Sequence, residues 1–142
     1  MTPEALAALH ARAFPGPPRP WSAAEFAEVL ALPGVALFTA GTAAFLIARR
    51  AGPEAEILTL CTAPDARRQG HAARLLAEMQ RWAEASGVEE LFLEVAETNI
   101  AARALYAAAG FVPRGHRKDY YDAGGRVRVH AHVMGKCLAP KG

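Results

Sequence analysis

A short basic loop at residues 67–72 has the composition of an anion-binding turn. The loop reads Arg67-Arg68-Gln69-Gly70-His71-Ala72 and is followed by apolar residues at helical spacing. The first N–H groups of a helix lack intrahelical partners and the helix dipole adds partial positive charge, so a phosphate is the expected occupant. No Lys-Ser/Thr pair follows the glycine and the loop does not read GxGxxG, so neither ATP nor NAD is implied. The loop therefore predicts a site for a pyrophosphate attached to another molecule.

Two titratable side chains are candidates for proton transfer. Glu94 stands in the apolar segment 91–95, where apolar neighbours can raise the pKa of a carboxyl group and suit it as a general base. Its alternative is a solvent-facing carboxylate on an alternating strand. Tyr106 can donate a proton to a departing thiolate, or it can be a packed residue of an amphipathic helix. Asn99, just before that helix, can be a ligand or the helix N-cap.

The N-terminal half predicts two helices and a sheet. Thr2-Pro3-Glu4 begins a helix that extends to about Arg12, and the capping box Ser22-Ala23-Ala24-Glu25 begins a second helix that stops before Pro33. Short apolar segments at 35–39, 43–49 and 56–62 then predict a three-stranded antiparallel meander.

The C-terminal half alternates strands and helices. A helix follows the basic loop and ends at Ser86-Gly87, a strand covers 91–95, and an alanine-rich helix covers 99–109. This order implies a parallel strand pair with a crossover. Final strands are expected at 111–115 and 127–137, joined by the polar stretch 117–122 and a Gly124-Gly125 turn. We expect one domain over residues 1–142, an α/β mixed sheet with helices on its faces.

Composition restricts the class of protein. The chain has 142 residues, 16 Lys and Arg against 14 Asp and Glu, and a net charge of +2, a balance that argues against nucleic acid as the main partner. The uncharged run 29–48 contains Pro33-Gly34 and Gly41, so we expect two strands there and no membrane span. Cys61 and Cys137 show no zinc spacing or CxxC motif and are typical of a reducing, cytoplasmic protein.

Taken in order, these motifs resemble the Gcn5-related N-acetyltransferase (GNAT) superfamily. The resemblance spans residues 56–121 and is carried by Leu60-Cys61-Thr62, the basic loop, Leu93-Glu94-Val95, Asn99-Ile100-Ala101-Ala102, Ala104-Leu105-Tyr106 and Gly110-Phe111. It implies the acyl-CoA N-acyltransferase fold, a mostly antiparallel central sheet with one parallel strand pair and helices on both faces. Within the superfamily, Phe92-Leu93-Glu94-Val95, Asn99, Ala104-Leu105-Tyr106 and Arg117-Lys118-Asp119-Tyr120-Tyr121 are similar to the ribosomal-protein alanine N-acetyltransferases.

The resemblance implies a reaction and a set of site residues. Acetyl would pass from acetyl-CoA to an amine by direct attack, the acceptor being the N-terminal α-amine, an alanine, of a protein such as a ribosomal protein. Glu94 would remove the amine proton, directly or through water, and Tyr106 would protonate the coenzyme A thiolate. The implied cofactor-binding residues are Leu60, Cys61, Thr62, Arg67, Arg68, Gln69, Gly70, His71, Ala72, Ala73 and Asn99. No metal is needed for this chemistry.

Several alternatives stay open at this point. The same donor can serve a small-molecule amine acetyltransferase, or the chain can be a non-catalytic acyl-CoA-binding module, against which Glu94 and Tyr106 speak because binding alone requires neither. Cys61 as a covalent nucleophile lacks a His or Asp at a readable spacing to activate it. His130 and His132 alternate on one strand face, but a third metal ligand is not signalled.

The chain departs from the subgroup in its last strand. The subgroup usually carries an acidic pair before an Ala and a later Met, whereas residues 129–134 here read Val-His-Ala-His-Val-Met. Losing acids and adding histidines changes the electrostatics of the acceptor groove. The segment Phe14–Trp21, rich in proline and aromatic residues, is expected to line that groove.

Overall fold

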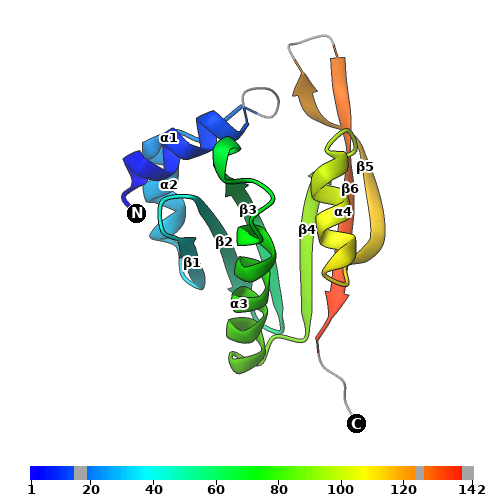
Figure 1. The fold of residues 1–142 in the computed structure, drawn as a ribbon. Helices are drawn as coiled ribbons and strands as arrows, with labels where there is room; N and C mark the ends of the chain where they lie inside the picture. The colour runs from blue at the N-terminus through cyan, green and yellow to red at the C-terminus, as the bar shows by residue number, and fades with distance from the viewer. Residues whose placement is uncertain (15–18, 124–126, 139–142) are drawn as a thin grey trace.

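The protein forms a six-stranded mixed sheet with helices on both faces, as the computed structural model shows (Figure 1). The structure describes residues 1–14, 19–123 and 127–138, and for 116–130 it describes only the strand backbone. The predicted Gly124-Gly125 turn and residues 15–18 of the predicted aromatic loop lie outside this part. The elements are α1 (Pro3–Ala13), α2 (Ala23–Leu30), β1 (Val35–Ala40), β2 (Ala44–Ala51), β3 (Glu54–Thr62), the 3-10 turn η1 (Pro64–Ala66), α3 (His71–Ala85), β4 (Glu90–Ala96), α4 (Ile100–Ala108), β5 (Val112–Ala123) and β6 (Val127–Cys137).

Local capping explains where the first two helices begin. The Thr2 hydroxyl accepts a hydrogen bond from the Ala5 N–H at 3.1 Å. The Ser22 hydroxyl accepts from the Glu25 N–H, and the Glu25 carboxylate accepts from the Ser22 N–H in return. Both predicted helix starts are therefore confirmed, because each satisfies N–H groups that the helix itself leaves without partners.

The strand order is β1-β2-β3-β4-β6-β5, with β3 and β4 as a parallel pair. Backbone pairing between β3 and β4 runs only from Glu54–Glu90 to Ile57–Leu93. Beyond that point the two strands separate, as Figure 1 shows. The crossover from β3 to β4 passes through α3, which confirms the predicted strand–helix–strand unit.

A β-bulge at Leu58 changes which side chains of β3 face which helices. Ala48 of β2 pairs with Ile57, and Ile47 pairs with Thr59, so Leu58 is an extra residue on β3. Ile57 packs in the core under α3 and α4, whereas Leu58 packs with the core under α1 and α2. Paired residues of antiparallel strands point to the same face, so Thr59 follows Ile47 toward α1.

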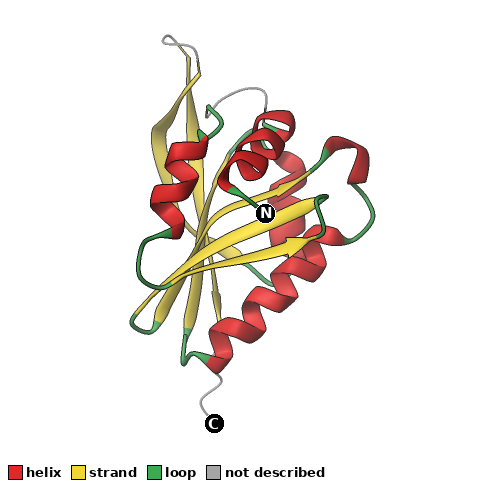
Figure 2. Cartoon of the chain, turned by 90° about the vertical axis from the view of Figure 1, so that its left-hand side faces the viewer, coloured by secondary structure: helices red, strands yellow, loops and turns green. Residues whose placement is uncertain are grey.

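Two apolar cores hold the helices to the sheet. Under α1 and α2, Leu6 and Phe26 pack against Phe45 and Ile47 of β2. Under α3 and α4 the larger core includes Leu46, Leu75, Met79, Leu91, Leu93 and Tyr106. Figure 2 shows the twisted sheet between these helices. Helices on both faces of a mixed sheet with one parallel pair confirm the predicted fold class.

The predicted polar link at 117–122 is wrong. β5 continues to Ala123 and pairs with β6, with Arg117 opposite Ala131 and Ala123 opposite Val127. Ladder hydrogen bonds join backbone groups, so a polar sequence can extend as a strand wherever a neighbouring strand supplies partners. The partner here is β6, which lies between β4 and β5 in the sheet and follows β5 directly in the chain.

The uncharged run at 29–48 covers the end of α2, β1 and part of β2, which confirms two strands there. Across the described ranges, we find no helix with the length and apolar character that a membrane crossing requires.

Candidate functional site

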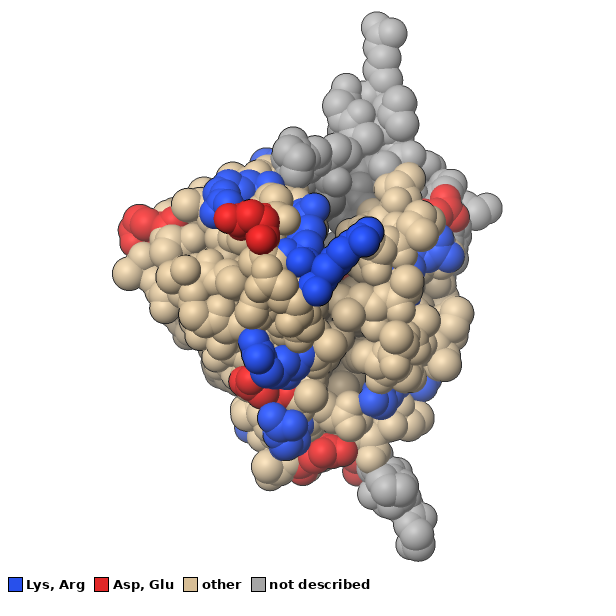
Figure 3. All heavy atoms as spheres, in the orientation of Figure 1, with Lys and Arg blue, Asp and Glu red and all other residues tan. Residues whose placement is uncertain are grey.

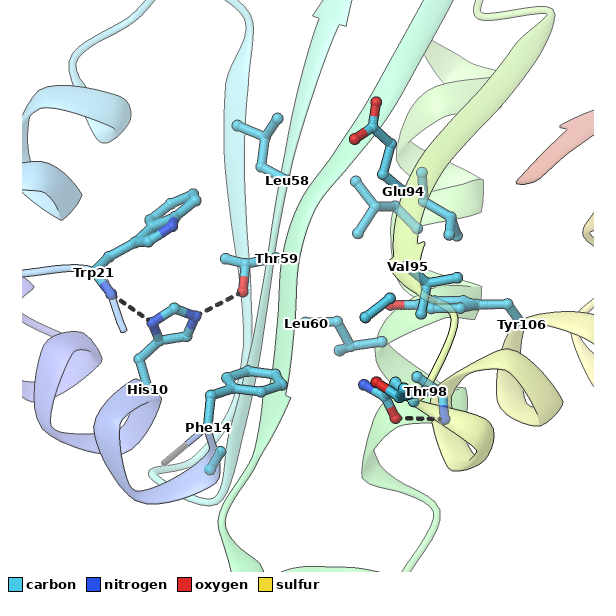
Figure 4. A pocket seen from close by; sticks show the side chains of 16 residues that line it. His10, Phe14, Trp21, Leu58, Thr59, Leu60, Glu94, Val95, Thr98 and Tyr106 are labelled. Atoms are coloured by element: carbon cyan, nitrogen blue, oxygen red, sulfur yellow. Dashed lines mark hydrogen bonds between the residues drawn. The ribbon is translucent and has the colours of Figure 1, made fainter. Parts of the chain in front are cut away.

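A cavity of about 400 Å³, here called the central cavity, lies where β3 and β4 separate. Figure 4 shows that α1 and the segment before α2 form one side and that β4 and α4 form the other. Its wall contains His10, Ala13, Phe14, Trp21, Ile57, Leu58, Thr59, Leu60, Leu93, Glu94, Val95, Ala96, Thr98, Asn99, Ala102 and Tyr106. The separation of the parallel strands thus opens the sheet to a ligand at the centre of the molecule.

Glu94 reaches this cavity because of the alternation of β4. Leu93 and Val95 are buried in the core under α3 and α4, so Glu94 between them points to the opposite face. The side chain is half-buried, and its carboxylate is directed into the cavity space (Figure 4). The predicted carboxylate among apolar neighbours therefore lies on a cavity wall rather than on the open surface.

A second cavity of about 410 Å³, the side cavity, adjoins the first at Leu93 and Glu94. Glu54 and Glu56 of β3 also line it, together with Arg49. Partial burial, and secondly the charge of Glu94, raise the pKa of Glu56. The sheet face beside Glu94 is therefore predominantly acidic.

Tyr106 projects from α4 toward the same space. The side chain is 7% exposed and packs edge-on against Phe111, with ring centroids 5.8 Å apart. Figure 4 shows its hydroxyl directed into the central cavity, on the same side as Glu94. Tyr106 therefore packs in the core, as an amphipathic helix residue does, and also lines the cavity, where a proton donor would have to lie.

A third cavity, of about 650 Å³ and here called the loop cavity, contains almost all of the predicted cofactor residues. Leu60, Cys61, Thr62, Arg67, Arg68, Gly70, His71, Ala72, Ala73 and Asn99 line it, and Gln69 is the exception. The Gln69 side chain lies instead near His71, with Oε1 at 3.2 Å from Nε2 of the ring. Leu60, Asn99 and Tyr106 line both the loop cavity and the central cavity.

The basic loop presents backbone N–H groups at the start of α3. Gly70 is the N-cap and has φ +81°, and Arg68 also has a positive φ, of 64°. Glycine has no side chain to cover the first turn, and alternating backbone conformations of this kind form a concave set of N–H groups that binds anions. Figure 3 shows basic side chains over the loop that leads into α3. The loop thus begins the helix as the sequence predicted, and its role toward a phosphate stays a prediction.

Two of the predicted cofactor residues also have structural roles. Arg67 donates to the carbonyl oxygen of Ala13 at 3.3 Å, which ties the loop to the end of α1. Asn99 caps α4, because its Oδ1 accepts from the Ala102 N–H at 3.2 Å. Since Asn99 also lines both large cavities, its cap role does not remove it from the site.

Cys61 is an inert thiol in this setting. Its side chain is 2% exposed, and burial raises its pKa to about 12, against the smaller opposing effect of Arg67 and then Arg12. A protonated buried thiol is a poor nucleophile, so the covalent alternative has no support. The other alternative, a metal pair, involves His130, whose side chain lies outside the described residues, and His132, whose Nε2 is 3.5 Å from Oε1 of Glu97.

Sequence reasoning missed His10, Thr59 and Thr98 on the wall of the central cavity. Phe14 and Trp21, the two ends of the predicted aromatic loop, line the central cavity, and the role of this segment toward an acceptor stays a prediction. No motif marks His10 or Thr59, which are 49 residues apart in the chain. The one available signal was a histidine within the first helix.

The fold and the two cavities that share a wall define the class of protein. The model of the acetyltransferase (GNAT) family matches residues 6–111, and the chain belongs to this family. Membership confirms the predicted resemblance and, at the level of the family, an enzyme of the acyltransferase class.

Within this family, the chain is similar to several individual acetyltransferases. The chain is 30% identical to the ribosomal-protein-S18-alanine N-acetyltransferase of Escherichia coli, whose crystal structure matches with a TM-score of 0.85 over 99% of this chain and 90% of that one. It is 34% identical over 64% of its length to the ribosomal protein bS18 alanine N-acetyltransferase of Haemophilus ducreyi, covering 63% of that protein. It is 44% identical over 42% of its length to an aminoglycoside N(6')-acetyltransferase of Serratia marcescens, covering 40% of that protein. The matched stretches thus span less than two thirds of these two sequence relatives.

Proposed function

We propose that the protein is an acetyl-CoA-dependent N-acetyltransferase that acts on the N-terminal α-amine of a protein or peptide, alanine in the first instance, with a ribosomal protein as the physiological acceptor. The observation that carries the proposal is the shared wall: Tyr106 lines both large cavities, whereas Glu94 lines the central cavity and not the loop cavity. The donor and the acceptor can therefore approach from two sides and meet beside Tyr106.

The loop cavity suits the donor. The N–H groups at Gly70 and the first turn of α3 would hold the pyrophosphate. The end of β3 at Leu60–Thr62 would hold the pantetheine arm, because β4 has separated from β3 there and leaves the β3 edge open to form backbone hydrogen bonds. The thioester would then lie near Tyr106.

The central cavity suits the acceptor and its proton transfers. The amine nitrogen would attack the thioester carbonyl, forming the amide C–N bond as the C–S bond breaks. Glu94 would take the proton from the amine, directly or through one water, and Tyr106 would give a proton to the departing sulfur. An α-amine has a pKa of about 7.7–8.0, so its neutral nucleophilic form is accessible near pH 7, more so than that of a lysine amine at about 10.4.

A cytoplasmic location is part of the proposal. Cys61 and Cys137 are both free thiols, one buried and one exposed. A reducing compartment is where free cysteines of this kind persist.

Mass spectrometry of an acceptor panel tests the function. Peptides with free N-terminal alanine, peptides beginning with other residues, N-blocked lysine peptides and small amines would each be incubated with the protein and acetyl-CoA. We expect one acetyl group on the alanine peptide, located at the α-amine by fragmentation. Acetylation of the small amines alone would favour the second candidate, and no acetyl transfer to any acceptor would favour a non-catalytic binder.

That second candidate is a small cationic amine as acceptor. Glu54 and Glu56 beside Glu94 make the side cavity acidic, and an acidic wall attracts a polycationic substrate. The panel therefore includes a polyamine and an aminoglycoside.

A further inference from the structure

We propose that the Thr59 hydroxyl is a specificity-determining hydrogen-bond donor, positioned by His10, that recognises the carbonyl oxygen of the first residue of the acceptor. The inference rests on the proposed function, because it names how the central cavity distinguishes an α-amino carbonyl compound from a simple amine. His10, the residue that would position Thr59, is a buried residue of α1.

The hydrogen bonds of His10 determine which ring nitrogen carries the proton. The Trp21 backbone N–H donates to Nδ1 at 2.9 Å, so Nδ1 is an acceptor. In a neutral imidazole the proton then resides on Nε2. Nε2 lies 3.2 Å from the Thr59 hydroxyl oxygen and therefore donates to it. Figure 4 shows this chain of contacts from Trp21 through His10 to Thr59.

The surroundings of His10 keep it neutral and rigid. The side chain is 6% exposed, and the rings of Phe14, Trp21 and Phe26 lie with centroids 5.0, 5.6 and 5.4 Å from its own. Burial lowers the pKa of His10 to about 4, against a smaller opposing effect of Glu25. At neutral pH the ring is therefore uncharged, and the tautomer set by Trp21 persists.

The hydrogen bond from His10 determines how the Thr59 hydroxyl can act. Its oxygen accepts from His10, so the hydroxyl hydrogen is left to donate to another group. Thr59 lines the central cavity, and Figure 4 places it across the cavity from Glu94. The β-bulge at Leu58 is the reason, because without the extra residue Thr59 would share the α3 face with Ile57.

The chemistry of the acceptor matches this arrangement. Glu94 on one wall would receive a proton of the amine, while Thr59 on the other wall offers a donor. In an N-terminal residue the carbon that carries the amine is bonded to the carbonyl carbon, and the carbonyl oxygen is a hydrogen-bond acceptor. A simple alkylamine has no oxygen there. A site whose polar group is satisfied only by the correct substrate discriminates against an analogue that lacks the partner.

The test compares two acceptors and three variants. One acceptor is a peptide beginning with alanine, and the other is the same peptide with the first amide replaced by a trans-alkene, which removes the carbonyl oxygen and keeps the shape. We expect Thr59→Val to lower kcat/KM on the amide peptide about fivefold, mainly through KM, because a neutral hydrogen bond contributes about 1 kcal/mol. On the alkene peptide the change should stay below about twofold. Thr59→Ser should recover most of the loss, and Thr39→Val, at an exposed site on β1, serves as the control.

His10 variants separate positioning from packing. In His10→Gln the amide Nε2 can take the place of the ring Nε2 and donate to Thr59, whereas in His10→Asn the shorter side chain serves only the Trp21 N–H. We expect His10→Asn to show the selectivity of Thr59→Val, and His10→Gln to recover the preference for the amide peptide. Adding Thr59→Val to His10→Asn should cause no further loss of selectivity.

Four results would overturn the inference in whole or in part. Equal losses on both peptides in Thr59→Val would assign Thr59 a structural role, and no loss on either would remove it from recognition. Equal selectivity in His10→Gln and His10→Asn would overturn the positioning role of His10, and the Thr59 variants decide the rest even if the His10 variants do not fold. If the unmodified protein acetylates neither peptide, the proposed function fails together with this inference, an outcome distinct from the first two because it appears before any substitution.

Discussion

Ile57 of β3 and Leu93 of β4 form the last backbone pair of the parallel strands, and both side chains are buried in the core under α3 and α4. One residue further along each strand, Leu58 and Glu94 line the central cavity. The sheet is therefore closed by apolar packing immediately beside the carboxylate that would take part in proton transfer. A candidate base supported in this way is held by rigid strands rather than by a loop.

Glu94→Gln should separate catalysis from donor binding. The amide has nearly the shape of the carboxylate but cannot accept the amine proton, so we expect turnover to fall by about 100-fold or more. Glu94 does not line the loop cavity, so the acetyl-CoA Kd should change by less than about twofold, as measured by calorimetry. Glu28→Gln, at an exposed site on α2, is the matched control. Wild-type turnover in Glu94→Gln would contradict the assignment.

Tyr106→Phe should remove a general acid while leaving the core intact. The phenyl ring keeps the edge-on contact with Phe111, so the free energy of unfolding should change by no more than about 1 kcal/mol, the contribution of a typical hydrogen bond. Turnover should fall about 100-fold because the thiolate would leave without a proton donor. A variant that unfolds easily, or that loses affinity for acetyl-CoA and keeps its turnover, would show that the hydroxyl is structural.

Gly70→Asp should weaken donor binding. A carboxylate at the N-cap of α3 would place negative charge where the pyrophosphate would lie, and we expect the acetyl-CoA Kd to rise at least about tenfold, or about 1.4 kcal/mol. Gly41→Asp is a strict control, because Gly41 also has a positive φ, of 56°, and open space around its Cβ position. Both variants therefore carry similar backbone strain. Unchanged affinity in Gly70→Asp would place the phosphate site elsewhere.

His10 should make stability depend on pH in the acid range. Its pKa is about 4 in the folded protein, against 6.5 for an unperturbed histidine side chain, so between these values the unfolded chain binds the proton. The free energy of unfolding is therefore highest above pH 6.5 and falls as the pH drops toward 4, by no more than about 3 kcal/mol in total. Urea titrations at pH 7 and pH 5 should show a smaller difference in His10→Gln than in the wild type. The same difference in both proteins would rule out this origin.

The helix starts and the basic loop are the parts of the structure that the sequence predicted well. Thr2 and the Ser22–Glu25 box determine helix starts through hydrogen bonds that span three residues, so neighbours in the chain are enough to predict them. The resemblance to a family then named ten of the residues that line the loop cavity, and also Gln69, which does not line it. The extension of β5 escaped prediction because its polar side chains do not indicate that its backbone pairs with the strand that follows it, β6.

What the sequence by itself determined is local: the helix caps, the glycine at the start of α3, and the alternation that places Glu94 opposite the buried Leu93 and Val95. The tertiary structure alone decided how those parts meet. The bulge at Leu58 arises from register against β2, and it turns Thr59 toward His10, which is 49 residues away in the chain. The wall of the cavity is formed by segments that are distant in sequence, and side-chain packing rather than secondary-structure propensity determines their contacts. A local sequence pattern therefore does not predict a contact such as that between His10 and Thr59.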